Sequence, residues 1–383
     1  MRRLLAALVA LCALAAPPKQ KEKKERPPAH NKIWDKSMRC VPAPAAARNA
    51  SRYTPRYAYM VVVGPISRSA PRYGTWLYPI LALRHALARK GSRADLVVLC
   101  ALEEGYEQDR MLPEEEALFA GQGIRWRYVP KPRIRGFHMG HYKLWAWQHT
   151  EYARVQLLDA DVLPLANMDA LFELPGLADA PFVGCPGKDS VLNAGWFSLR
   201  PDCDHFKKMT DLLWYRGQRG GHPWDTARGW GVDMPPWLNA LDRPMKAGWD
   251  FFDSRGNQGH MYAYFRFFAK DLVLIFGDRV LAWGHRGGAE DAASARALAR
   301  GGAAPRVVAD RGAGGPLADR VWANFPCPFH SGPAPELAYY HFTGSRKPWN
   351  KHDRRNAKFA EWYDTLADIG VDVQAVLFGG ATT

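Results

Sequence analysis

The sequence has few cysteines, and none of them has the spacing of a metal or redox pair. Six Cys occur in 383 residues, and no two form a Cys-x-x-Cys motif. If a leader containing Cys12 is removed, five remain, so at least one thiol is unpaired or pairs between chains. A disulfide scaffold is not indicated. One structural bridge is compatible with the count, but the spacing does not assign it.

A long apolar segment is also missing. The apolar run Leu4–Ala16 has 13 residues, whereas a membrane-spanning helix needs about 20. Two arginines precede this run, and Ala-Leu-Ala at 13–15 fits a signal-peptidase site. We therefore predict a signal peptide over 1–16, with an uncleaved short anchor as the alternative. Either one places the protein in the secretory pathway, in the Golgi lumen or secreted, and a retained anchor would associate it with the membrane.

A basic folded surface is not indicated, although the net charge is +14. Residues 1–56 hold 13 Lys/Arg and 3 Asp/Glu, which is +10 and leaves only +4 for the rest of the chain. The excess thus lies in a segment rich in Pro, Ala, Lys and Arg over 17–56, which is typical of a stem or linker. We therefore predict no nucleic-acid partner.

Apolar strands and helical patterns alternate along the rest of the chain, without an internal repeat. Strands are expected over 57–63, 95–100, 124–129, 153–158, 193–199 and 272–276, and helices over 75–90, 113–120, 140–148, 257–268 and 354–366. This order predicts an α/β fold with a mainly parallel, two-sided central sheet. We expect one domain over 57–372, with a flexible Gly/Ala-rich insertion at 287–315 and a tail at 373–383.

Two carboxylates follow the predicted strand at 153–158. Asp159 and Asp161 flank Ala160, and apolar residues resume at once with Val-Leu-Pro-Leu. Like charges at this spacing repel, more so when desolvated, unless they share a divalent cation. A solvated turn is the alternative, but apolar sequence on both sides makes it less favourable.

A second cluster occupies 339–349, with the sequence YYHFTGSRKPW. Apolar residues precede His341, and Gly344 allows the backbone to lie close to a ligand. Lys347 supplies a point charge suited to phosphate. The spacing is typical of a metal ligand beside a diphosphate clamp, although a lone His is more often structural.

Four segments together resemble glycosyltransferase family 8, which includes the glycogenins and related galactosyl-, glucosyl- and glucuronosyltransferases. They are LLDADVLPLANMDALF, LNAGWFSLRP, NQG before an aromatic helix, and HFTGSRKPW, in this order. The resemblance implies a GT-A fold, a divalent cation such as Mn²⁺, a UDP-sugar donor and retention of anomeric configuration. It also implies transfer of a hexosyl or hexuronosyl group to a glycan, protein or lipid acceptor.

The resemblance assigns three groups of residues, position by position. The implied metal ligands are Asp159, Asp161 and His341. The implied donor-binding residues are Asp159, Ala160, Gly195, Gly344, Lys347 and Tyr73. The implied catalytic residues are Lys143, Asn193, Gln258 and Asn257. Lys143 could instead be an exposed helix lysine, and Asn193 a strand-end hydrogen-bonding residue; Ala194 stands where the family has Ser.

Asn257 departs from the family pattern, which usually has Asp before Gln258. Asn cannot act as a carboxylate nucleophile or base, although a front-face mechanism does not need one. Asp250 and Asp253 lie nearby and could substitute. The departure favours, as an alternative, a non-catalytic protein that binds nucleotide-sugars or glycans. Self-glycosylation is a weaker alternative, because 287–315 contains no Tyr and the leader argues against a cytosolic glycogen primer.

Overall fold

The computed structural model describes 40, 56–66, 76–102, 110–132, 134, 137–172, 181–187, 190–218, 227–232, 248–269, 273–275, 306–309, 321–324, 329–330, 339–342, 347–350 and 353–373. The structural statements below concern these residues. The predicted signal peptide, almost all of the stem, Tyr73 and Gly344 lie outside them.

Seven strands form the central sheet, in the order β3-β2-β1-β4-β7-β6-β8. Their bounds are β1 Tyr57–Ile66, β2 Asp95–Leu102, β3 Ile124–Val129, β4 Arg154–Leu158, β6 Phe182–Gly187, β7 Ser190–Leu199 and β8 Val273–Ile275. The pairs β3·β2, β2·β1, β1·β4 and β6·β8 are parallel, and β7 is antiparallel to both β4 and β6. The predicted α/β class with a mainly parallel central sheet is confirmed.

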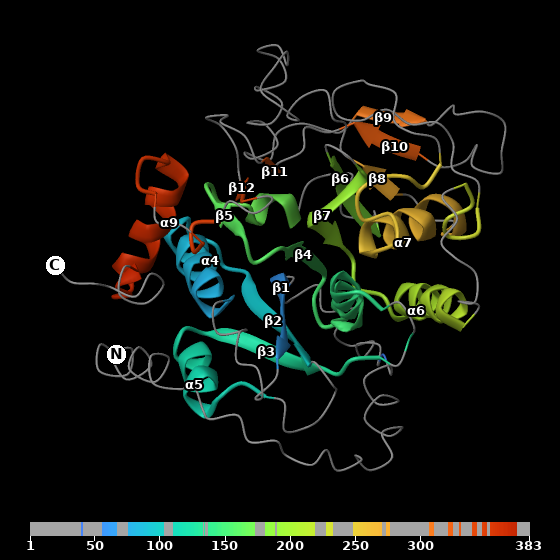
Figure 1. Cartoon of the computed structure of the whole chain (residues 1–383). Coiled ribbons are helices and arrows are strands. Elements are labelled where there is room, and N and C mark those ends of the chain that lie inside the picture. Colours follow the sequence, from blue (N-terminus) through green and yellow to red (C-terminus); the bar gives the residue numbers. More distant parts are fainter. Residues whose placement is uncertain are drawn as a thin grey trace, which may run out of the picture.

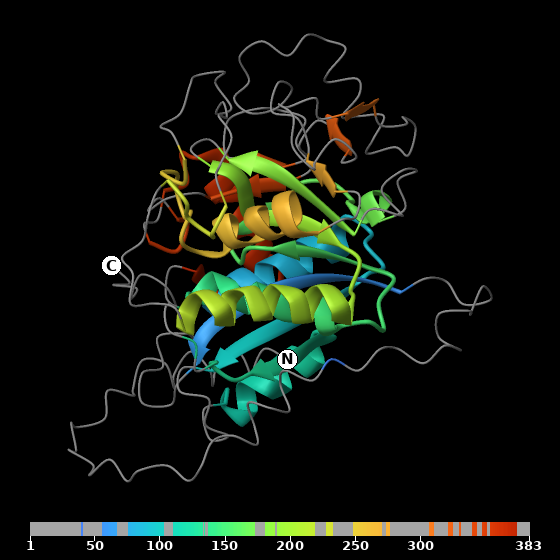
Figure 2. The ribbon, with the colours of Figure 1, turned by 90° about the vertical axis from the view of Figure 1, so that its right-hand side faces the viewer.

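Both faces of the sheet are covered, because successive residues of its strands point to opposite sides. In β1, Tyr59 and Val61 pack into one apolar cluster, while Ala58 and Met60 pack into another. Helices α4 (Leu77–Arg89) and α9 (Ala357–Asp368) pack on each other on the first side (Figure 1). The 3-10 helix η2 (Met139–Gln148), α6 (Cys203–Gln218) and α7 (Asn257–Ala263) cover the second side (Figure 2). Helix α5 (Pro113–Gly121) packs beside β3.

A small second sheet brings a late segment of the chain to the end of β4. Strand β12 (Tyr339–His341) lies between β11 (Phe329–His330) and β5 (Val162–Pro164). The pairing of β12 with β5 is antiparallel and sets His341 opposite Val162. Strand β5 was not predicted, because three residues after the Asp pair are too few to show a period of two.

The structure corrects several predicted elements. The predicted insertion at 287–315 contains a strand, β9 (Arg306–Ala309), which pairs with β10 (Val321–Asn324). The helix predicted over 257–268 divides into α7 and a π-helical segment η4 (Tyr264–Phe268). Strand β6, helix α6 and the short η3 (Asp169–Phe172) were not predicted. Pairing and burial decided these elements more than their own periodicity.

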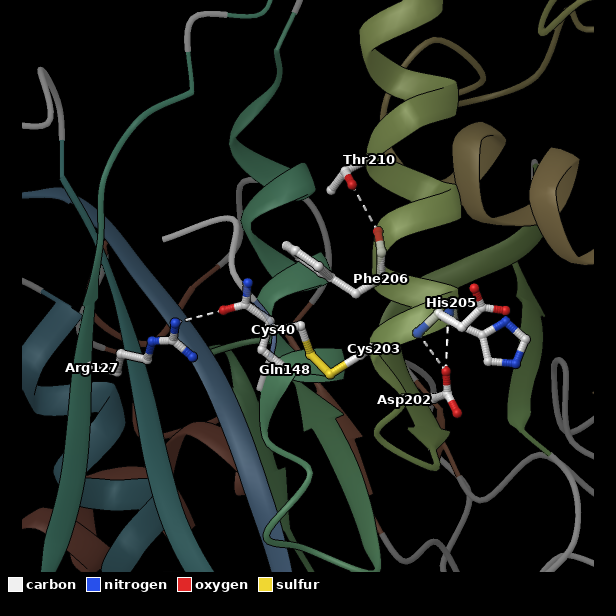
Figure 3. The surroundings of a disulfide bond; sticks show 9 residues. Cys40, Arg127, Gln148, Asp202, Cys203, His205, Phe206 and Thr210 are labelled. Atoms are coloured by element: carbon white, nitrogen blue, oxygen red, sulfur yellow. Dashed lines mark hydrogen bonds between the residues drawn. A yellow bond between two sulfur atoms is a disulfide. The ribbon is translucent and has the colours of Figure 1, made fainter. Parts of the chain in front are cut away.

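One disulfide joins the chain before β1 to the start of α6. Cys40 and Cys203 are bonded, with 5.3 Å between their Cα atoms (Figure 3). The first turn of α6 is capped by Asp202, whose Oδ1 accepts from Asp204 N at 2.7 Å and His205 N at 3.1 Å. Cys100 is a free buried thiol, and burial raises its pKa, so it is held protonated and inert. Among the helices that the structure describes, none is long and apolar enough to cross a bilayer.

Candidate metal and donor site

Backbone pairing places the two carboxylates at the end of β4. Asp159 N donates to Gly195 O of β7 at 2.9 Å, and Val162 N closes the turn by donating to Asp159 O at 3.2 Å. Phe342 N, just beyond β12, donates to Asp161 O at 2.9 Å. The backbone around both carboxylates is therefore fixed by sheet pairing from β7 and β12.

Asp159, Asp161 and His341 converge. One donor atom from each lies within 4.8 Å of the others. His341 Nε2 is 3.1 Å from Asp161 Oδ1 and 3.9 Å from Asp159 Oδ2. Two carboxylate oxygens and one imidazole nitrogen form a mixed hard and intermediate donor set, which fits a divalent cation such as Mn²⁺. The three residues expected as metal ligands are thus brought together.

Asp161 is buried beside two basic side chains, His341 and Lys347. Burial alone would raise the pKa of its carboxyl, but the nearby His341 and Lys347 outweigh burial and lower this pKa well below its usual range. Lys347 donates to Asp161 Oδ2 and to Phe342 O. Lys347 therefore lies at the same centre as the predicted metal ligands.

Lys143 is buried, so the alternative of an exposed helix lysine is wrong. Its side chain is 9% exposed, and Nζ lies 2.6 Å from Asp159 Oδ1. The same Nζ donates to Ala194 O at 2.7 Å. A buried ammonium group is stable here because it is paired with a carboxylate and a carbonyl. Lys143 thus links η2 to the end of β4 and to β7.

The residues of β7 at the site use their polar groups to shape the backbone. Asn193 Oδ1 accepts from Gly195 N at 2.7 Å, which is a local turn-like contact. Gly195 in turn accepts from Asp159 N. Ala160 packs into the apolar cluster beneath the turn, and its side chain is buried. These contacts shape the backbone of β7 and of the turn beside Asp159.

A buried hydrogen-bonded group supports this turn from below. Gln156 Oε1 accepts from Trp196 Nε1 and from Tyr339 OH, each at 3.0 Å. Gln156 Nε2 donates to Met168 O at 3.0 Å. One side chain of β4 therefore ties together β7 and β12, the two strands that contact the Asp159–Asp161 turn.

Gln258 connects α7 to the same region. Its Oε1 accepts from Ala194 N at 3.1 Å, and its Nε2 donates to Phe252 O at 3.4 Å. Because Ala194 O accepts from Lys143, Gln258 and Lys143 bind opposite ends of one residue. Gln258 is buried, so it serves as a link between α7 and β7.

Asn257 is buried in a contact between two helices. It is 4% exposed, and its side chain packs on Gly140 at the start of η2. A Cβ at Gly140 would lie 2.4 Å from Asn257 Oδ1, so only glycine fits there. This position holds a neutral side chain in a buried contact between two helices.

One acidic residue joins the site at a position to which the family pattern assigns no role. Asp253, on the turn before α7, accepts from Gln258 N through Oδ2 at 3.1 Å. Asp253 is one of the two nearby acids expected from the sequence as possible substitutes, and Asp-Ser-Arg-Gly over 253–256 is a turn signal. Asp250, the other acidic residue considered, is exposed.

Two relatives illustrate what the chain is similar to in sequence. The provisionally assigned glucuronosyltransferase PGSIP8 of Arabidopsis thaliana is 30% identical over 163 residues, which cover 41% of this chain and 30% of that protein. Glycogenin-1 of Oryctolagus cuniculus is 34% identical over 79 residues, covering 21% of this chain and 23% of that protein. These similarities confirm the resemblance to glycosyltransferase family 8. The chain spans less than a third of the length of either relative.

No protein-family model matches the chain. Among solved structures, the galactosyltransferase LgtC in complex with donor and acceptor sugar analogues is similar, with 14% identity and a TM-score of 0.42. That match covers 82% of this chain and 96% of LgtC. At this distance the fold assignment rests on the strand order of the chain itself, given above.

Proposed function

We propose that this protein is a metal-dependent, retaining glycosyltransferase. It would move a hexosyl or hexuronosyl group from a UDP-sugar to a glycan, protein or lipid acceptor in the secretory pathway. The observation that carries the proposal is the convergence of Asp159, Asp161 and His341 with Lys347 at the end of β4. The sequence similarity to a glucuronosyltransferase and to glycogenins supports it.

The charges of the site suit a nucleoside diphosphate. Asp159 is paired with Lys143, and Asp161 with Lys347, so the two carboxylates are already balanced. A divalent cation held by Asp159, Asp161 and His341 would give the site a positive excess. The negatively charged diphosphate of a nucleotide-sugar would balance that excess. The cation supplies stabilisation of charge on the leaving diphosphate, and Lys347 adds a second positive group.

The Cys40–Cys203 bridge supports the predicted compartment. Structural disulfides persist in secreted and lumenal proteins and are rare in the cytosol. This bridge ties the end of the predicted stem to the domain. It agrees with a Golgi-lumenal or secreted protein, and it adds to the argument against a cytosolic glycogen primer.

The test is release of UDP from a panel of UDP-sugars by the full chain, with and without Mn²⁺. We expect release from one donor, only with metal. Asp161→Asn should abolish that release while leaving the fold intact, which circular dichroism checks. Asp211→Asn is a matched control, because Asp211 is exposed on α6 and pairs with Lys207. A fully active Asp161→Asn variant would refute the assignment.

A non-catalytic binding protein on the same fold is the second candidate, and Asn257 favours it. It predicts metal-dependent binding of UDP without release from any donor. In that case Asn257→Asp should create activity from none, as expected of a degenerate site. Calorimetric titration that shows metal-dependent UDP binding, together with no UDP release from any donor, would identify this candidate.

A further inference from the structure

Two of the predicted metal ligands belong to different sheets. Asp159 follows β4 of the central sheet, and its backbone N–H donates to Gly195 O of β7. His341 is the last residue of β12, which forms a separate three-stranded sheet with β5 and β11. A cation that binds both residues therefore depends on how the small sheet lies against the central sheet.

The small sheet has little backbone pairing of its own with which to hold His341. Strands β12 and β5 have three residues each, and β11 has two. Sheets of such short strands are marginally stable unless other elements pack on them. Contacts from the central sheet are therefore needed to keep His341 in one place.

Gln156 makes such a contact at the boundary between the two sheets. It lies in β4, shortly before Asp159, and it is 0% exposed among apolar neighbours in the strand. Its Oε1 accepts from Tyr339 OH of β12 at 3.0 Å, close in sequence to His341. The same Oε1 accepts at 3.0 Å from Trp196 Nε1 of β7, the strand whose backbone holds Asp159. One oxygen atom is thus shared by the strand that carries His341 and the strand that fixes Asp159.

The orientation of the Gln156 amide follows from the chemistry of its partners. An indole N–H can only donate, and a backbone carbonyl oxygen can only accept. Oε1 must therefore point to Trp196, and Nε2 donates to Met168 O at 3.0 Å, beyond the end of β5. Trp196, Tyr339 and Met168 all belong to one buried apolar cluster, where a polar group without a partner is costly. The amide is therefore held in one position.

We propose that Gln156 is a positioning residue for the cation, because it fixes the small sheet against the central sheet. It would thereby set the distance between the carboxylate of Asp159 and the imidazole of His341. The role rests on the proposed function, and the fully buried Gln156 itself has no access to cation or donor. Ligands must be held within about 0.5 Å of their productive geometry. Residues that orient metal ligands from outside typically contribute about 10- to 100-fold in metal affinity.

Tyr339→Phe tests this contact with the smallest change to the fold. It removes the hydrogen bond to β12 and leaves Gln156 bonded to Trp196 and Met168. We expect the Kd of the full chain for Mn²⁺ to rise about tenfold, with the number of ions bound per chain unchanged. Electron paramagnetic resonance of free Mn²⁺ during a titration measures both quantities without turnover. An unchanged Kd would overturn the proposal.

Tyr152→Phe is the matched control. Tyr152 is also buried, and its hydroxyl donates to Asp95 Oδ2 at 2.8 Å, at the start of β2 and therefore at the opposite end of the sheet. Each variant loses one hydroxyl, so both should melt at a lower temperature, but Tyr152→Phe should keep the wild-type Kd for Mn²⁺. An equal rise in Kd in both variants would show a general loosening of the fold and overturn the proposal. So would fewer bound ions at unchanged Kd in Tyr339→Phe, as expected of a purely structural role.

Substitutions of Gln156 itself give a second readout. Gln156→Met removes all three contacts at similar side-chain length, and we expect Kd for Mn²⁺ to rise about 100-fold. The KM for Mn²⁺ in UDP release should rise with it, whereas kcat at saturating Mn²⁺ should return to near the wild-type value. Gln156→Glu can reproduce the contacts as a protonated acid, because burial favours its neutral form, so its Kd should lie closer to wild type. Wild-type Kd in Gln156→Met would overturn the proposal.

The outcomes also separate this inference from the proposed function. If the wild-type chain binds Mn²⁺, Asp161→Asn abolishes the binding and Tyr339→Phe leaves it unchanged, only the role of Gln156 fails. If the wild-type chain neither binds Mn²⁺ nor releases UDP from any donor, the proposed function fails, and the role of Gln156 fails with it.

Discussion

The two sides of the site are held by different interactions. On the metal side, backbone pairing with β7 and β12 fixes Asp159 and Asp161. Each carboxylate also forms an ion pair with a lysine, Asp159 with Lys143 and Asp161 with Lys347. On the α7 side, the buried Asn257 and Gln258 are neutral, and the Gln258 side chain accepts from Ala194 N and donates to Phe252 O. Removing a charge should therefore impair function on the metal side, whereas adding one should impair folding on the α7 side.

Lys143 is where the two sides meet, and replacing it should have the largest effect. Lys143→Met removes the cation between Asp159 and Ala194 O. We expect kcat/KM for UDP release to fall about 100-fold or more, as for loss of one preorganised donor. Steady-state kinetics on the preferred UDP-sugar measures it. Lys207→Met on the exposed face of α6 is the control, and equal activity in both variants would contradict a link through Lys143.

The disulfide lies away from both sides, so its loss should affect stability alone. Cys203→Ser should lower the free energy of unfolding by about 2–4 kcal/mol, because the bridge closes a long loop in the unfolded chain. Urea unfolding measures the loss, and UDP release should persist below the unfolding transition. Cys40→Ser should act equally, and the double variant should add nothing. Additive losses would show that the two cysteines are not bonded.

Adding a charge to the α7 side should destabilise the fold. Asn257→Asp places a carboxylate in the 4% exposed contact with Gly140. We expect a loss of about 1–3 kcal/mol in the free energy of unfolding and no gain in activity. Asn356→Asp is the matched control, because Asn356 caps α9 through contacts that Asp also makes. A gain in UDP release in Asn257→Asp would instead favour the degenerate-site alternative.

The smallest expected effect is on pH dependence. His260 of α7 is fully buried, and burial lowers its pKa to about 3. Between about pH 3 and the unfolded pKa of about 6.5, the unfolded chain binds a proton on this histidine that the folded chain does not bind. The contribution of His260 to the free energy of unfolding is therefore complete above about pH 6.5 and is lost as the pH falls through this range. From pH 7 to 6 we expect about 0.7 kcal/mol from this group. His260→Asn should flatten the dependence of urea midpoints on pH; an unchanged slope would show that His260 does not titrate on unfolding.

Most of the metal side could be predicted from local sequence. The apolar run before Asp159 reads as a strand, and two carboxylates at its end indicate a cation. His341 was identified by its spacing from Gly344 and Lys347. The α7 side was harder, since the sequence offered Asp250 and Asp253 as equal alternatives and could not show which of them contacts α7. The contact of Asp253 depends on φ 57° and on a hydrogen bond from Gln258, and neither has a periodic signal.

Local sequence alone thus determined the alternating strands and helices, the carboxylate pair and the basic N-terminal segment, because periodicity, burial and charge are properties of neighbouring residues. Only the tertiary structure decided which residues meet. It paired Cys40 with Cys203, buried Lys143 against Asp159, and turned Asn257 inward while Asp253 lies over the start of α7. These contacts join residues far apart in the chain, or depend on which way a turn faces, and packing of the whole domain settles both.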